Sequence, residues 1–316
     1  MPEIRPAGVS VQPYQYVKKN FSNIRKVSIP VEQNNQPKGM SKGKKITIAT
    51  AAAALLGIGA LVITRGKAAA KAAQKAKLLA DIPPELQTRF SAIKDLKGKE
   101  FVDRAYSELV EYMGLKGVAP KEVAIKNTDG LLGVTGGYNF IDNTIEFSEG
   151  FLTKLNQEGQ LRMMAHELRH CKQYTDMLRT EGITVEKYVE SAVKSMMDGA
   201  KNNALNFQYQ AAYNKAKEQG RLQEFLANVK KQWTEDLSKK VRENYKDVLA
   251  MPKIKADSPE GIKAHENLKA NSEYVGLGFL GTASDAYRNN PLEVDAYAFG
   301  DKMKEMFEKF IKAVNI

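Results

Sequence analysis

The chain has 316 residues, of which 43% are hydrophobic and 27% charged, a composition typical of a globular protein with one large domain or two small ones. Its net charge of +11 is concentrated at one end, because residues 1–80 hold fourteen of the 48 Lys/Arg and only two of the 37 Asp/Glu. The remainder is therefore near neutral, which argues against a nucleic-acid partner, and a basic excess around an apolar segment favours a membrane surface instead.

The first element that the sequence predicts is a transmembrane helix over residues 46–64. This segment contains no charged residue, and as a helix it would be about 28 Å long, close to the thickness of the hydrocarbon core. An alanine-rich soluble helix is the alternative. Residues 1–45 are polar and basic, which predicts a mostly disordered tail that is too long for the first part of a signal peptide.

Basic residues flank the predicted span on both sides. Five Lys/Arg lie within about twenty residues before it and five within about twenty after it. The charges therefore indicate a single-pass membrane protein but not the side of the membrane on which the rest of the chain lies. We expect an Ala/Lys-rich linker over residues 65–82 and one folded domain over residues 83–316.

The first part of this domain is mainly helical, with a small β region. Proline at position 84 suits the start of a helix, and the later apolar residues recur at helical or alternating spacing. The predicted elements are a helix from Pro84, a helix over 100–115, a strand over 123–125, a turn at Gly136-Gly137, a hairpin with strands 138–140 and 144–147 around Asp142-Asn143, and a helix over 158–178.

For the second part of the domain the sequence predicts only helices and loops. Residues 185–250 form long amphipathic helices with a break near Gly220, and the aromatic residues there are more typical of a core than of a binding site. The remaining predictions are a core at Phe207, Tyr209, Tyr213 and Trp233, a loop over 252–259, a polar helix over 259–270 and a helix over 291–314. The fold class is thus α+β, predominantly helical, with residues 185–250 as a long helical insertion.

His166-Glu167-Leu168-Arg169-His170 is the most informative motif of the chain. Two histidines four residues apart lie on one face of a helix and can bind one Zn²⁺, while Glu167 can act as general base toward a water that the metal activates. The apolar residues Leu161, Met164, Leu168 and Cys171 fall on the opposite face. We therefore expect a zinc site on one side of this helix and a core on the other, with Cys171 as a core residue.

A catalytic zinc site usually needs a third protein ligand. Glu293 is one candidate, in the first turns of the last helix, where Ala296 and Gly300 would let a second helix approach closely. The other candidates are His265 in a polar helix, Asp176 six residues after His170, and Asp295, which points away from Glu293. The spacing alone leaves these alternatives open.

The motif His166-Glu167-x-x-His170, followed downstream by Glu293-x-x-Ala296, resembles the gluzincin branch of the zincin metallopeptidases, most closely its membrane-associated and ImmA/IrrE-like members. The resemblance implies a zincin-like domain with Glu293 as the third zinc ligand and residues 144–147 as the edge strand that aligns a peptide substrate. The sequence departs from the family pattern at Tyr297, where an Asp is expected, and in the long helical gap between His170 and Glu293.

These features predict a membrane-anchored zinc metalloendopeptidase that hydrolyses a protein or peptide substrate. Tyr287 and Tyr297 are candidate donors to the oxyanion. A rival hypothesis is an inactive, membrane-anchored zinc-binding scaffold. A second rival is a nucleotide-binding enzyme, because residues 276–281 read G-x-G-x-x-G, but no strand–helix–strand context surrounds that match.

Overall fold

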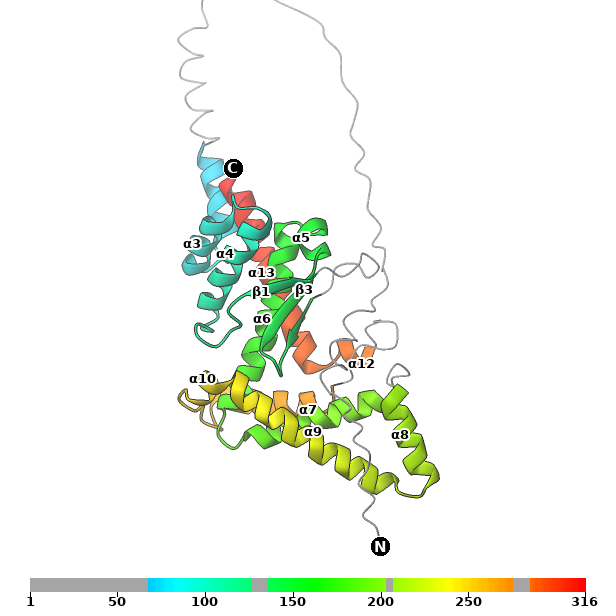
Figure 1. Cartoon of the computed structure of the whole chain (residues 1–316). Helices are drawn as coiled ribbons and strands as arrows, with labels where there is room; N and C mark the ends of the chain where they lie inside the picture. The colour runs from blue at the N-terminus through cyan, green and yellow to red at the C-terminus, as the bar shows by residue number, and fades with distance from the viewer. Residues whose placement is uncertain (1–67, 127–135, 203–206, 275–284) are drawn as a thin grey trace, which may run out of the picture. The chain divides into compact units, whose positions relative to one another are not determined.

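The computed structural model describes residues 68–126, 136–202, 207–274 and 285–316. They form a predominantly helical α+β structure with a small three-stranded sheet, as the sequence predicts (Figure 1). The elements are α3 (Pro84–Ile93), α4 (Gly98–Tyr112), β1 (Val123–Lys126), β2 (Gly136–Asn139), β3 (Thr144–Ser148), α5 (Gly150–Lys154), α6 (Gln157–Arg179), α7 (Val185–Asn202), α8 (Phe207–Glu218), α9 (Leu222–Asn244), α10 (Lys246–Leu249), α11 (Pro259–Ser272), α12 (Asp285–Arg288) and α13 (Pro291–Val314).

The predicted membrane span over residues 46–64 lies outside the described residues. Among the helices that the structure describes, none is long and apolar enough to cross a membrane. The chain divides into two compact units, one containing residues 91–305 and the other containing residues 68–90 and 306–316. In the second unit the Phe90 ring packs on Phe307 and Phe310, with centroid distances of 5.1 and 5.7 Å.

The sheet of the first unit has the order β1-β3-β2, with β1 parallel and β2 antiparallel to β3. The predicted hairpin is confirmed, because Asn139 pairs with Thr144 and Asn143 occupies the turn with a φ of 51°, a conformation that asparagine tolerates well. The prediction of β3 as an edge strand is wrong. β3 lies between the other two strands, so the edge beside the helix of the histidines is β2, which packs against α6.

The predicted turn at Gly136-Gly137 is also wrong, because both residues belong to β2. A Cβ atom added to Gly136 would lie 2.2 Å from Cδ1 of Phe147 on the neighbouring strand. The Phe147 ring is buried and stacks on Phe151 at a centroid distance of 4.1 Å. Glycine is therefore needed here for close packing against a ring rather than for a turn.

Helix α6 crosses the core of the first unit. Its N-terminus is capped by the Asn156 side chain, whose Oδ1 accepts a hydrogen bond of 3.0 Å from the Gly159 N–H. The apolar face that the sequence predicts is confirmed, since its four residues are at most 1% exposed: Leu161, Met164, Leu168 and Cys171. The opposite face, with both histidines, is buried as well.

Helices α7, α8 and α9 follow α6, and α7 packs along α9 (Figure 1). The predicted break at Gly220 is confirmed, and its φ of 68° explains why glycine stands there. Trp233 and Tyr209 are buried core residues, as expected. The predicted loop ends at Ser258, whose hydroxyl caps α11 by accepting a hydrogen bond of 3.1 Å from the Gly261 N–H.

Candidate metal centre

His166 and His170 lie one turn apart on α6, and their rings pack edge to face at a centroid distance of 4.8 Å. The two Nε2 atoms are 3.2 Å apart. Both residues are buried, since 9% of the surface of His166 and 7% of that of His170 is exposed. The helical spacing thus brings one ring nitrogen of each histidine to the same point.

Glu293, from the first turns of α13, brings its carboxylate to this point. Its Oε1 atom lies 3.3 Å from Nε2 of His170, and its Oε2 atom lies 3.5 Å from Nε2 of His166. The residue is only 1% exposed. Asn290 fixes the start of α13 because its side chain accepts a hydrogen bond from the Leu292 N–H and donates one to the Ala270 carbonyl.

The close approach of α13 to α6 depends on small residues, as the sequence predicts. Ala296 is fully buried. A Cβ atom added to Gly300 would lie 2.8 Å from the Arg162 carbonyl oxygen and 3.4 Å from Cβ of His166. The two helices can therefore come close enough for Glu293 to reach both histidines.

The three side chains fit a zinc ion. Four tetrahedral ligands at about 2.0–2.1 Å from zinc lie about 3.3–3.4 Å from one another, and the distances here are 3.2, 3.3 and 3.5 Å. The Oε2 atom of Glu293 is buried and has no hydrogen-bond partner among the described residues. A cation between the three side chains would supply the partner that this oxygen lacks.

Glu167 is the second carboxylate near the histidines, and its position suits a different role. One carboxylate oxygen of Glu167 lies within 4.8 Å of a ring nitrogen of each histidine. One of its oxygens, Oε2, accepts a hydrogen bond of 2.8 Å from the Tyr138 N–H of β2. The carboxylate is thus held beside the three-ligand set rather than within it.

Gln173 connects the two helices that carry the ligands. Its Oε1 atom lies 2.9 Å from Nδ1 of His170, and its amide nitrogen donates to the Leu292 carbonyl at 3.1 Å and to Asp295 at 2.7 Å. Arg169 binds the same Asp295 carboxylate through two hydrogen bonds. This arrangement orients His170 with its Nε2 atom toward Glu293.

Tyr274 holds the other side of Glu293, because its hydroxyl donates a hydrogen bond of 2.8 Å to Oε1. Tyr274, Tyr138 and Gln173 are site residues that the sequence motifs did not predict. Gln173 stands three residues after His170, so helical spacing alone could have indicated it. The two tyrosines come from a strand and from the end of α11, and no local pattern marks them.

The two candidate oxyanion donors both lie close to the histidines. The Tyr297 ring packs against His166 at a centroid distance of 4.4 Å and is partly exposed. Tyr287 packs edge-on against Tyr274 at 5.6 Å, and burial, with a smaller effect of the Glu293 charge, raises its pKa far above 10. Where the family pattern has an Asp, Tyr297 offers no partner to Nδ1 of His166, which is buried without a hydrogen bond among the described residues.

The other candidate ligands lie elsewhere. The exposed His265 contacts the Glu181 carbonyl, Asp176 pairs with Lys172, and Asp295 pairs with Arg169. Cys171 is fully buried, and burial raises its pKa to about 12, so it is a core residue. The glycines at 276, 278 and 281 lie outside the described residues.

A cavity of about 160 Å³ opens beside the histidines and is lined by β2, α6, α7, α11 and the residues around Glu293. The residues that line it include Glu167 and a set of aromatic side chains: Tyr138, Phe140, Tyr174, Tyr274 and Tyr287. A reactant that reached the histidines would therefore lie in a largely aromatic pocket.

Charges at the site are coupled in the metal-free protein. Burial alone would lower the pKa of His170, but the hydrogen bond and charge of Glu293 outweigh it and raise this pKa from 6.5 to about 9. Burial alone would raise the pKa of Glu293, but the nearby His166 and His170 rings hold it far below 4.5. A buried imidazolium–carboxylate pair results, and a metal ion would replace its proton.

No known protein family, curated protein or solved structure matches this chain. The function of the site is therefore argued from its geometry.

Proposed function

We propose that the protein is a membrane-anchored, zinc-dependent metallopeptidase of the gluzincin type. The observation that carries this proposal is the approach of Glu293 to both Nε2 atoms at 3.3–3.5 Å, with Glu167 held beside them. His166, His170 and Glu293 would hold the metal, and three protein ligands leave a position for a reactant. The anchor would be the apolar segment over residues 46–64.

Zinc in such a site acts as a Lewis acid on a carbonyl oxygen and lowers the pKa of a water molecule. Glu167 would take the proton of the attacking water and pass it to the leaving amine. The hydrogen bond from the Tyr138 N–H fixes one oxygen of this carboxylate. Tyr297, which packs against His166, and Tyr287, which lines the cavity, would donate to the developing oxyanion.

Strand β2 offers an edge along which a peptide could lie. Tyr138 points its N–H toward Glu167 and therefore away from β3. In an antiparallel pair, residues two apart point their backbone groups to the same side, so those of Gly136 also point away from β3. A peptide substrate would pair with the backbone groups of Gly136, since the Tyr138 N–H binds Glu167, and would place an apolar side chain in the aromatic cavity.

A catalytically inactive zinc-binding scaffold is the second candidate. The buried, unpartnered Nδ1 atom of His166 favours it, because ligand histidines in active sites usually donate this proton to an orienting group. Zinc binding without hydrolysis would distinguish this candidate from a peptidase.

The test is to assay hydrolysis of a peptide library by the full chain and by Glu167→Gln. We expect the variant to keep zinc and to lose about 10²–10⁴-fold in rate, the usual contribution of a general base. Glu181→Gln is the matched control, since this glutamate is exposed at the end of α6 and should leave the rate unchanged. Equal rates in wild type and Glu167→Gln would refute the mechanism.

A further inference from the structure

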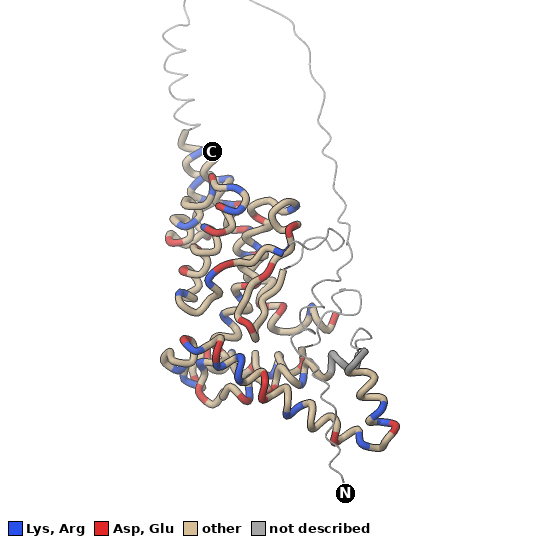
Figure 2. Tube along the Cα trace, viewed as in Figure 1, with Lys and Arg blue, Asp and Glu red and all other residues tan. Residues whose placement is uncertain are grey.

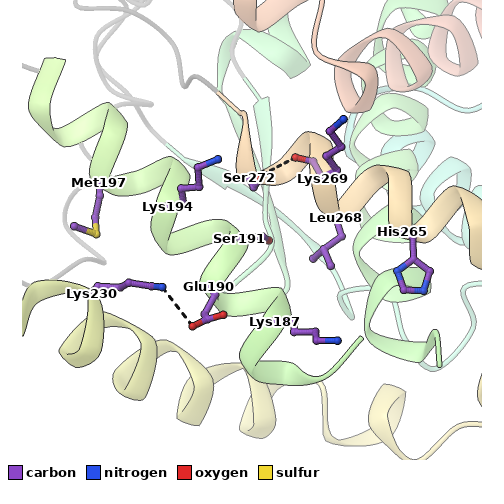
Figure 3. A pocket seen from close by; sticks show the side chains of 10 residues that line it. All are labelled: Lys187, Glu190, Ser191, Lys194, Met197, Lys230, His265, Leu268, Lys269 and Ser272. Carbon is purple, nitrogen blue, oxygen red and sulfur yellow. Dashed lines mark hydrogen bonds and ion pairs between the residues drawn. The ribbon is translucent and has the colours of Figure 1, made fainter. Parts of the chain in front are cut away.

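A second hollow, of about 570 Å³, lies between α7, α9 and α11 (Figure 3). Four lysines line it: Lys187 and Lys194 from α7, Lys230 from α9 and Lys269 from α11. Glu190 is the only carboxylate among its lining residues, and its oxygen lies 3.5 Å from the Lys230 amine. The hollow is therefore strongly cationic.

Three of these amines have no carboxylate partner among the described residues. Lys187 donates to the Gly182 carbonyl at 2.9 Å, whereas no carboxylate of the described residues lies within 4.0 Å of Lys194 or Lys269, both exposed. Elsewhere in the described part of the chain, basic and acidic residues are intermixed (Figure 2). This hollow is thus a local excess of positive charge on a nearly neutral domain.

The spacing of the lysines favours an extended anion. Lys187 and Lys194 are seven residues apart on one helix, which separates them by about 10.5 Å along its axis. This separation suits an anion whose charges are spread along its length better than a single phosphate or carboxylate. An extended peptide covers this distance in about three residues.

The apolar residues that line the hollow favour a peptide over other polyanions. Met197 and Leu268 are half-buried there and offer apolar surface to a side chain. No Phe, Tyr or Trp is among the lining residues, whereas surfaces for single-stranded nucleic acid use aromatic rings to stack the bases. The chain's own residues 1–67 are a poor occupant, because they hold eleven Lys/Arg and two Glu.

We propose that this hollow binds an extended acidic segment of a partner polypeptide, with carboxylates at the lysines and apolar side chains at Met197 and at Leu268. The proposal does not depend on peptidase activity. The bound segment would contact helices that also wall the histidine cavity. Ser191 of the hollow accepts a hydrogen bond from Asn271 at 2.7 Å, and Asn271 accepts one from Tyr174 of the cavity at 3.1 Å.

The experiment measures binding of a short fluorescent peptide of glutamates and leucines to the full chain by anisotropy at low salt. The double variant Lys194→Glu/Lys269→Glu should bind about tenfold more weakly than wild type, because two attractions become repulsions. Lys121→Glu/Lys302→Glu is the matched control, with the same change of net charge at exposed positions outside the hollow. It should bind within about twofold of wild type.

A photoreactive leucine in the same peptide provides the second measurement. Cross-links within residues 187–272 are expected. Equal affinity of the two double variants, or cross-links confined to the basic residues 1–67, would overturn the proposal. It would also be overturned if an RNA oligonucleotide or phosphatidylserine vesicles bound more tightly than the peptide and lost affinity in the Lys194/Lys269 variant.

Discussion

Gln173 is the residue through which α6 and α13 fix each other at the proposed zinc site. It contacts His170 on its own helix and Leu292 and Asp295 on the other. The family resemblance would place an orienting Asp at the position of Tyr297, which packs against His166, whereas Gln173 contacts the other histidine, His170. An amide can replace a carboxylate here because it needs only to accept one proton from the imidazole.

Replacement of Gln173 by Ala should therefore weaken zinc binding by about ten- to a hundredfold, the usual effect of removing a group that orients a ligand. Competition with a chromophoric chelator measures this affinity. Gln157→Ala is the control on the same helix, since the side chain of Gln157 bonds, among the described residues, to the Lys94 and Leu96 carbonyls and not to the site. Unchanged zinc affinity in Gln173→Ala would contradict the assigned role.

The coupled His170–Glu293 pair predicts a pH dependence of the metal-free protein. The raised pKa of His170 contributes stability below pH 6.5 that is lost as the pH rises toward about 9. The lowered pKa of Glu293 contributes stability above pH 4.5 that is lost at more acidic pH. The melting temperature after chelation should thus fall between pH 6.5 and 9, and Glu293→Gln should flatten this slope. An equal slope in the variant would argue against the pair.

At the scale of elements, the approach of α13 to α6 makes a sharp prediction for Gly300→Ala. Alanine favours a helix over glycine by about 1 kcal/mol, whereas the added methyl group would lie 2.8 Å from the Arg162 carbonyl, an overpacking that costs about 1–3 kcal/mol. These two effects on the free energy of unfolding partly cancel. The added methyl group still forces α6 and α13 apart, and this displaces the zinc ligands that they carry. We expect about tenfold weaker zinc binding with a small change in melting temperature.

The control for this variant is Ala298→Ser at an exposed position of α13. It should preserve zinc affinity. If Gly300→Ala bound zinc as tightly as wild type, the close approach of the two helices would not be what positions Glu293.

Helix α7 and the residue after α9 also hold the end of β2, the strand that binds Glu167. The hydroxyls of Tyr188 on α7 and Tyr245 after α9 both donate to the Phe140 carbonyl, at 3.2 and 2.8 Å. The double variant Tyr188→Phe/Tyr245→Phe leaves this carbonyl without partners and should destabilise the protein by about 1–3 kcal/mol. Chemical denaturation measures the loss, and zinc content should stay unchanged. No loss of stability would mean that Tyr188 and Tyr245 do not support the end of β2.

Sequence patterns predicted those elements whose cause is local. Helix α13 starts at Pro291, and the hairpin turns at Asn143, because proline and asparagine favour these backbone conformations. The central place of β3 and the packing role of Gly136 were not predictable, because each depends on a partner distant in sequence. The same holds for Tyr274, which reaches Glu293 only through the folded chain.

For the whole molecule, the basic excess and the candidate metal site lie in different parts of the chain. Residues 1–80 carry the basic excess, while the described helices carry intermixed charges (Figure 2). If residues 46–64 span a membrane, the full chain should remain with lipid vesicles after washing with high salt, because only surface electrostatic binding is screened. A chain without residues 1–67 is the comparison and should be released. Release of the full chain by salt would contradict the proposed anchor.

The central claim is that His166, His170 and Glu293 together hold one zinc ion. The most direct test is the zinc content of the purified full chain measured beside that of Glu293→Ala by atomic emission. The site predicts about one zinc per chain in wild type and little or none in the variant. No zinc in the wild type, or equal zinc in both proteins, would contradict the three-ligand site.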